Sequence, residues 1–190
     1  MEKDKKKQLI RAAVKRFEKH GIKKTTLDEI ARDLRISKAS IYHYFNSKEE
    51  LYHSTLEWES MQFIDELNNI NSTLELTAIG FINKYLEFKE SLNQKYFLIY
   101  RVVLSILQEE NFEKEDIFIN NFLKSEEETL AKLLATFNVN KKDFPESFSS
   151  FLVKQSWGSL LANKLYNKSK PEENLKKKEM FIQLIESILI

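Results

Sequence analysis

Residues 25–51 read TTLDEIARDLRISKASIYHYFNSKEEL, and the rest of the chain is organised around this stretch. The pattern predicts two short helices joined by a tight turn and followed at once by the start of a third. Thr26 and Glu29 have the spacing of a capping box, in which each side chain bonds to the backbone amide of the other residue. Ser37 is a favourable N-cap for the second short helix, expected over 38–45.

Longer helices are expected on both sides of this stretch. Ser47–Glu50 reads as a second capping box, which opens a helix that continues to about Asn69. On the N-terminal side, a helix is expected from about Asp4 to His20, and Gly21 is expected to end it because glycine adopts a positive φ at little cost. The apolar residues of this first helix fall on one stripe at helical spacing: Ile10, Ala13, Val14 and Phe17.

The second short helix has one face that folding does not require. Ile41 and Phe45 share one side of the helical wheel and are expected in the core. Basic, hydroxyl, imidazole and phenol groups lie elsewhere on it, on Lys38, Ser40, Tyr42, His43 and Tyr44. Such a face suits a nucleic-acid groove. The alternative is purely structural: the tyrosines cover a small core, the lysines are ordinary solvated charges and the threonines only cap helices.

The composition predicts an all-α fold. The chain has 190 residues with only 3 Gly and 2 Pro, whereas sheet-rich folds need many turn residues. We expect a three-helix N-terminal helix-turn-helix domain over 1–46 and a larger helical bundle over 47–190, about nine helices in total. The later helices are expected near 73–91, 94–109, 114–137, 145–167 and 172–189.

Charge and residue types narrow the function. Residues 1–53 hold 14 Lys and Arg against 8 Asp and Glu, whereas the rest of the chain is net acidic, so a polyanion is the expected partner of the N-terminal part only. The chain has no Cys, which excludes disulfides, thiolate nucleophiles and Cys-based zinc sites. No signal-peptide pattern or membrane-length apolar run is visible, so we expect a soluble, cytoplasmic protein with no membrane partner.

Residues 10–51 resemble the TetR family of transcriptional regulators nearly position by position. The resemblance is carried by the following positions: Ala12, Ala13, Phe17, Gly21, Thr25, Thr26, Ile30, Ala31, Ser37, Tyr42, Phe45, Lys48 and Leu51. Two departures stand out. Arg35 occupies the turn position at which the family commonly has glycine, and the imidazole of His43 lies one position earlier than in the family's frequent Tyr-x-His-Phe ending.

A helix-turn-helix seats its second helix in the major groove of double-stranded DNA and its first across the backbone. The expected DNA-binding residues are Thr25, Thr26, Ser37, Lys38, Ala39, Ser40, Tyr42, His43, Tyr44 and Lys48. The two threonines, at a helix N-terminus, and Lys48 suit phosphate. Tyr42 offers its phenol to phosphate, as the resemblance also implies. His43 and Tyr44 are the candidates for base contact, and Ala39 permits close approach to a thymine methyl.

The acidic part of the chain is rich in aromatic residues, and the resemblance implies a small-molecule effector pocket there. A small apolar or aromatic effector is expected, with candidate contacts from Phe63, Tyr96, Tyr100, Arg101, Gln155 and Trp157. The competing interpretation is an ordinary aromatic core, with Arg101 on the surface or in a salt bridge. Glu49, His53 and Glu57 share a helix face and could in principle bind a metal ion. We expect them instead to form a solvated stripe of charges, and we expect no metal and no cofactor.

The last two helices, about 145–167 and 172–189, have the character of an interface. Gly158 and Ala162 would let a partner helix approach closely, and the C-terminal helix is apolar over more than one stripe. The resemblance implies that these helices pair with their copies in a homodimer. The alternative is burial within one chain.

The favoured hypothesis is therefore a homodimeric regulator of transcription, most simply a ligand-responsive repressor acting on a near-palindromic operator. The runner-up is an architectural DNA-binding protein without a small-molecule effector, which would bind with strong salt dependence and little sequence preference. An enzyme is disfavoured, because every His lies in or beside the helix-turn-helix and no nucleophile and base are paired by the pattern.

Overall fold

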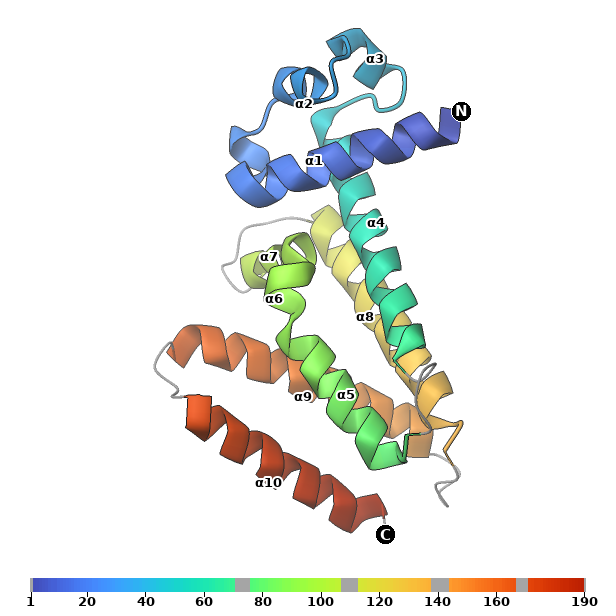
Figure 1. The fold of residues 1–190 in the computed structure, drawn as a ribbon, viewed down its shortest axis with the longest axis vertical. Coiled ribbons are helices and arrows are strands. Elements are labelled where there is room, and N and C mark those ends of the chain that lie inside the picture. The colour runs from blue at the N-terminus through green and yellow to red at the C-terminus, as the bar shows by residue number, and fades with distance from the viewer. Residues whose placement is uncertain (1, 71–75, 107–112, 138–143, 167–170, 190) are drawn as a thin grey trace. The chain divides into compact units, whose positions relative to one another are not determined.

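The computed structural model describes residues 2–70, 76–106, 113–137, 144–166 and 171–189 (Figure 1). Within these ranges the chain forms helices and no strands, which confirms the expected all-α fold. The helices are α1 Glu2–Lys24, α2 Leu27–Asp33, α3 Lys38–Tyr42, α4 Lys48–Asn69, α5 Ala78–Glu90, α6 Leu92–Lys95, α7 Phe97–Ile106, α8 Glu113–Leu134, α9 Phe144–Tyr166 and α10 Pro171–Leu189. None of the described helices is long and apolar enough to cross a membrane.

The end of the first helix agrees with expectation, and one later break does not. α1 is kinked at Gly21, whose φ of 75° and ψ of 159° are not helical. The regular helix therefore ends before Gly21, as expected, and a short second helical segment follows as far as Lys24. The expected break at residues 92–93 is instead the short helix α6, which raises the number of helices in the described ranges from nine to ten.

The local signals of the helix-turn-helix are confirmed. Thr26 and Glu29 form a complete capping box at the start of α2, and the Ser37 side chain accepts a hydrogen bond from the Ser40 amide at the start of α3. Arg35 lies in the turn between them with φ of 54°, the left-handed conformation that costs a non-glycine residue about 1–2 kcal/mol. The family's usual glycine would avoid that strain.

The second short helix is shorter than expected. α3 ends at Tyr42, although the amides of Tyr44 and Phe45 still donate to the Ile41 carbonyl and keep one more turn in place. At the next helix the second capping box is altered. Ser47 Oγ accepts from the Glu50 amide as expected, but the Glu50 carboxylate accepts from the Asn46 amide at 2.7 Å, one residue before the position that the box predicts.

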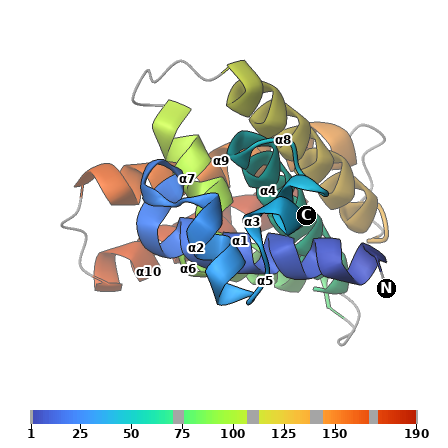
Figure 2. The same ribbon diagram turned by 90° about the horizontal axis from the view of Figure 1, so that it is seen from above.

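The expected core of the N-terminal helices is present. Ile41 and Phe45 of the recognition segment are buried, as are Phe17 of α1 and Ile30 of α2. The ring of Phe17 packs edge-on against Tyr52 of α4, with 5.5 Å between ring centroids. Figure 2 shows α1, α2 and α3 from a second side. Burial of these apolar side chains leaves the polar face of α3 outside the core.

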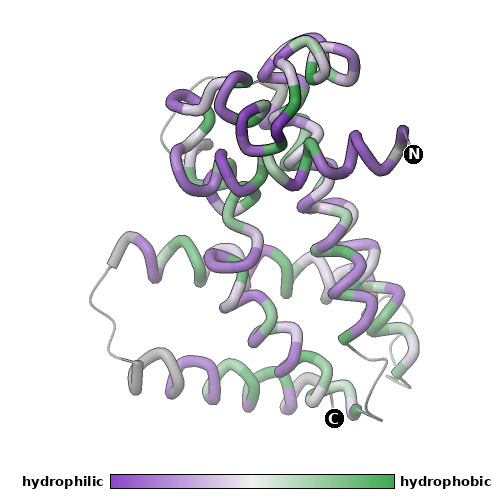
Figure 3. The backbone as a smooth tube through the Cα atoms, turned by 45° about the horizontal axis from the view of Figure 1, so that its top comes forward, coloured by the Kyte–Doolittle hydropathy of each residue, from purple (hydrophilic) through white to green (hydrophobic). Residues whose placement is uncertain are grey.

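The chain divides into two compact units. The N-terminal unit contains Met1–Phe63 and Tyr96–Val103, and the C-terminal unit contains Ile64–Lys95 and Leu104–Ile190. The division thus falls within α4 and within α7, both of which run from one unit into the other, whereas residue 46 was the expected domain boundary. In the C-terminal unit α8 packs along α9, and α5 contacts both α9 and α10. Figure 3 shows hydrophilic and hydrophobic residues alternating along α10.

A buried carboxylate attaches the start of α7 to α4 within the N-terminal unit. Glu59 of α4 is 2% exposed, and its oxygens accept from the amides of Leu98 at 3.3 Å and Ile99 at 2.7 Å. These amides belong to the first turn of α7, whose donors lack partners within the helix. The Tyr96 hydroxyl adds a bond to the Gln62 carbonyl at 3.2 Å. Burial raises the pKa of Glu59 to about 7 from 4.5, while the two amides oppose that shift.

The raised pKa of Glu59 predicts a pH-dependent stability. The folded state holds the Glu59 proton more tightly than the unfolded chain, so this stabilisation is complete below pH about 4.5 and is lost as pH rises through about 7. We expect the free energy of unfolding, measured with urea, to fall by up to about 3 kcal/mol across that interval because of this group. Glu59→Gln cannot ionise, so this part of the pH dependence of the unfolding free energy should be absent from the variant. Equal pH slopes in both proteins would contradict the assignment.

Candidate nucleic-acid interface

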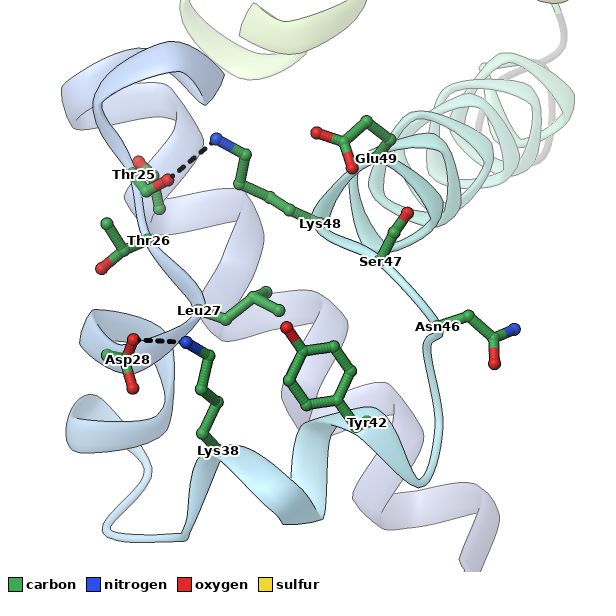
Figure 4. Close-up of a pocket in the computed structure, with 10 residues that line it drawn as sticks. All are labelled: Thr25, Thr26, Leu27, Asp28, Lys38, Tyr42, Asn46, Ser47, Lys48 and Glu49. Atoms are coloured by element: carbon green, nitrogen blue, oxygen red, sulfur yellow. Dashed lines mark hydrogen bonds and ion pairs between the residues drawn. The ribbon is translucent and has the colours of Figure 1, made fainter.

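A hollow of about 390 Å³ opens where α2 and α4 begin and α3 passes between them (Figure 4). We call it the α2–α4 hollow. It is lined by Thr25, Thr26, Leu27, Asp28, Lys38, Tyr42, Asn46, Ser47, Lys48 and Glu49. Five of the expected DNA-binding residues are therefore brought together: both threonines, Lys38, Tyr42 and Lys48.

Lys38 is held by a carboxylate of the neighbouring helix. Its Nζ donates to Asp28 Oδ2 at 2.8 Å, and both side chains are exposed. The hydrogen bond and the charge of Asp28 raise the pKa of Lys38. A DNA phosphate at this position must therefore compete with Asp28 for the ammonium, which lowers the net gain from the contact.

Tyr42 is the one aromatic residue among those that line the hollow. It is 48% exposed although the helix that carries it buries Ile41 completely. Its ring extends from α3 into the hollow, with the hydroxyl at the end that faces the start of α2 (Figure 4). A phenol held at the surface beside a lysine suits donation to a phosphate.

Lys48 has a structural role that sequence reasoning missed. Its Nζ donates to the carbonyl oxygens of Ile22 at 2.9 Å and Thr25 at 3.2 Å, which lie just beyond the Gly21 kink. The start of α4 is thereby tied to the segment between α1 and α2. An ammonium has three N–H groups, so Lys48 can also donate to a phosphate while it holds this segment.

The two threonines differ in what they present. Thr25 is 1% exposed, and its hydroxyl donates to the Gly21 carbonyl at 2.9 Å. Thr26 lies at the surface, but its amide and hydroxyl both donate to the Glu29 carboxylate, at 2.9 and 3.0 Å. These bonds lower the pKa of Glu29. A phosphate contact is thus open to Thr26 once Glu29 yields, whereas Thr25 points inward and positions the turn.

The outer face of α3 carries the remaining expected contacts. Ala39 and His43 are exposed, whereas Ser40 and Tyr44 are half-buried. Ser37 and Ser40 share a hydrogen bond of 2.8 Å between their hydroxyls. His43 Nε2 lies 3.5 Å from Glu2 Oε1 of α1, and its ring meets Tyr44 edge-on. His43 is therefore the more accessible of the two candidates for base contact, which remains a prediction.

An ion pair that the sequence pattern did not single out orients the helix-turn-helix on α1. Arg16 donates to both oxygens of Asp33, with Nε–Oδ2 of 2.6 Å and Nη2–Oδ1 of 2.7 Å, and lies 3.5 Å from Glu29. The guanidinium lowers the pKa of Asp33. Two parallel bonds restrain direction as well as distance, so Arg16 sets how α2 lies against α1.

The expected effector residues are distributed over both units. In the N-terminal unit Phe63 and Tyr96 are buried with ring centroids 5.3 Å apart, and Tyr100 is also buried. Arg101 is exposed, and its guanidinium lies 5.6 Å from the Phe97 ring. In the C-terminal unit Trp157 is buried and Gln155 is exposed on α9. Their role in ligand binding remains a prediction.

Sequence reasoning named Trp157 but missed the buried ion pair beside it in the C-terminal unit, and we call the whole group the Glu126 cluster. It consists of Tyr85, Lys89, Glu126, Ser156 and Trp157, all buried. Lys89 lies on the same stripe of α5 as buried Tyr85, and Glu126 lies on the same stripe of α8 as buried Phe122. A charge that interrupts an apolar stripe on each of two helices is the signal that could have revealed this pair.

Comparisons with known proteins match the N-terminal helices of this chain to one family. The family described as "Bacterial regulatory proteins, tetR family" matches residues 9–55. The chain is similar to the biofilm operon icaADBC HTH-type negative transcriptional regulator IcaR of Staphylococcus aureus (strain Newman). The two are 30% identical over 165 residues, which cover 80% of this chain and 81% of IcaR.

Solved structures share the fold over almost the whole chain. A transcriptional regulator from Cytophaga hutchinsonii ATCC 33406 matches with a TM-score of 0.70 and 24% identity, covering 92% of each chain. FadR of Bacillus subtilis, solved in complex with stearoyl-CoA, matches with a TM-score of 0.64 and 19% identity, covering 90% of this chain and 93% of FadR. At these identities the likeness establishes the arrangement of helices.

The Asp28–Lys38 pair generates a prediction about affinity for DNA. Asp28→Asn removes the carboxylate that competes for Lys38, so duplex DNA should bind several-fold more tightly in fluorescence anisotropy titrations. Lys38→Ala should weaken binding and lower the slope of log K against log salt by about 1, as expected for one lost phosphate contact.

Asp65→Asn is the matched control, because Asp65 is an exposed acid of α4 that does not line the hollow. It changes the net charge equally and should leave affinity nearly unchanged. If Asp65→Asn tightens binding as much as Asp28→Asn does, the gain reflects total charge and the local competition is refuted.

Proposed function

This chain belongs to the TetR family of bacterial transcriptional regulators, and on that premise we propose that it is a ligand-responsive repressor that binds a near-palindromic operator as a homodimer. The observation that carries the proposal is the α2–α4 hollow, where Lys38, Tyr42 and Lys48 converge beside the exposed face of α3. The protein is a regulator and not an enzyme.

The DNA-binding part of the proposal follows from the chemistry of the hollow. Two ammonium groups, a phenol and the Thr26 hydroxyl suit the phosphate backbone, which positions the protein without reading sequence. The exposed residues of α3, His43 among them, would then face the base edges of the major groove. Two such helices in a dimer would meet half-sites with centres about 34–36 Å apart, or a multiple of that distance.

Repression is supported by the relative with 30% identity. IcaR is named a negative transcriptional regulator, and the similarity extends over 81% of its length. This similarity supports negative regulation by this chain as well.

The homodimer is supported by an apolar face on α9 and α10. Phe151 on α9 and Met180 and Leu184 on α10 are exposed at 45%, 69% and 56%. The ring of Phe151 contacts Phe181 of α10, with 6.2 Å between centroids, so the two helices present one surface. Gly158 is exposed, and a Cβ there would meet nothing within 4 Å. Such a face favours a partner helix.

Ligand response is supported by the way the helices connect the two units. A ligand can weaken DNA binding only if it favours a state in which the recognition helices are placed differently. α4 starts at the hollow and continues into the C-terminal unit, and α7 also belongs to both units. FadR, which shares the fold, was solved with stearoyl-CoA, so this arrangement of helices is able to hold a ligand.

Selection of bound sequences from random DNA tests the operator proposal. We expect a near-palindrome, and Tyr42→Phe should bind it about tenfold more weakly, because a hydrogen bond to a charged phosphate contributes about 1.4 kcal/mol. Substitution by Phe retains the ring, so the thermal unfolding midpoint should not change. If no sequence is enriched, the chain binds DNA only non-specifically and the operator proposal is refuted. If Tyr42→Phe binds with unchanged affinity, the phenol does not contact the DNA.

Light scattering of Gly158→Leu tests the α9/α10 face. The space around Gly158 within one chain accommodates a side chain, so the variant should fold but should dissociate to a monomer as the partner helix is pushed away. Asn163→Leu is the matched control, since Asn163 is also exposed on α9 but points away from the stripe of Phe151 and Gly158. A Gly158→Leu dimer as stable as wild type would exclude this interface.

A further inference from the structure

The Glu126 cluster surrounds a cation with a carboxylate and two aromatic rings inside the C-terminal unit. The Lys89 ammonium lies 2.7 Å from Glu126 Oε1. It lies 3.9 Å from the centre of the Trp157 ring and 6.0 Å from that of the Tyr85 ring. A carboxylate combined with aromatic faces is the environment in which proteins recognise organic ammonium ions.

The carboxylate is oriented by groups other than the lysine. Trp157 Nε1 donates to Glu126 Oε2 at 2.9 Å, and the Tyr85 hydroxyl donates to Oε1 at 2.8 Å. Ser156 Oγ lies 3.2 Å from the Tyr85 hydroxyl and supports it. These bonds do not involve Lys89, so they hold the carboxylate in the same orientation when the ammonium leaves. The site is preorganised for a positive ion.

The lysine is an unfavourable occupant of this site. Burying an ammonium removes strong hydration, and a buried ion pair is often less stable than apolar residues of similar size. Consistent with this, burial lowers the pKa of Lys89 to about 8, and the attraction of Glu126 offsets the shift only in part. A quaternary ammonium spreads its charge over methyl groups and loses less hydration on entering the same site.

We propose that the Glu126 cluster is the effector site and that it takes monovalent organic ammonium ions, with the Lys89 side chain occupying the place of the ligand in the unliganded protein. This inference rests on the proposed ligand-responsive function and specifies its ligand class. Lys89 has a long flexible stem in the last turn of α5, so its charged end can move to solvent when the ligand enters.

Displacement of Lys89 also has a route to the N-terminal unit along the chain. α5 ends at Glu90, one residue after Lys89, and the short helix α6 leads from there to Tyr96. Residues 96–103 belong to the N-terminal unit, where Glu59 holds the first amides of α7. Repacking the end of α5 therefore acts on a segment that is only a few residues from the α4–α7 attachment.

The test uses the full-length chain with Trp58→Phe, which leaves Trp157 as the only tryptophan and so as a fluorescent reporter within the cluster. The probe is benzyltrimethylammonium chloride, compared with benzyl alcohol and sodium benzoate at constant ionic strength. We expect saturable quenching of Trp157 by the cation only, with release of operator DNA over the same concentration range.

Substitutions in the cluster separate the proposal from a purely structural ion pair. Lys89→Ala removes the internal competitor and should bind the cation at least about tenfold more tightly. Lys89→Met is the matched control, because it keeps an uncharged stem in the site and should gain less. Glu126→Gln keeps the shape but removes the charge, and should lose at least about tenfold in affinity. Thermal unfolding establishes that each variant is folded.

The proposal is overturned if wild type shows no saturable response to the cation, or responds equally to benzyl alcohol. A response to benzoate instead would make Lys89 the counter-ion of an anionic effector and would also overturn it. Should Lys89→Ala fail to fold, the wild-type titration still decides. If the cation binds but no preparation binds DNA, the proposed function fails and the ammonium site stands, so the two failures are distinguishable.

Discussion

The geometry of the DNA-binding surface depends on one ammonium group. Lys48, at the first turn of α4, donates to two carbonyl oxygens in the segment that follows the Gly21 kink. Because this segment leads directly into the Thr26 capping box, α2 and α4 begin on opposite sides of one hollow. Removal of that tie would free the starts of the two helices from each other, and Tyr42 would keep Lys38 as a neighbouring cation but lose Lys48.

Acidic groups of the chain already occupy the positions that phosphate would take. Asp28 holds Lys38, and Glu29 holds the amide and hydroxyl of Thr26. Each pair satisfies the polar groups of the free protein, and each must be exchanged for a phosphate contact on binding. Such exchange would limit affinity for any DNA and leave a larger share of discrimination to the base edges that α3 is proposed to contact.

One buried glutamate in each unit has a comparable structural role at a distance from the DNA surface. Glu59 of α4 caps the start of α7, and Glu126 of α8 accepts hydrogen bonds from side chains of α5 and α9. Buried charges are costly unless paired, so both sites tolerate few rearrangements.

The sequence by itself determined the helical fold, the capping box of α2, the N-cap of α3 and the burial of Ile41 and Phe45, because periodicity and capping act over a few neighbouring residues. It also indicated the strained turn at Arg35. Only the tertiary structure decided that Thr25 points inward, that Lys48 ties α4 to the end of α1, and that Lys89 and Glu126 meet. The contacts of Lys48 and Lys89 join residues 23 to 37 positions apart, and no local pattern specifies which distant partner a buried charge will find.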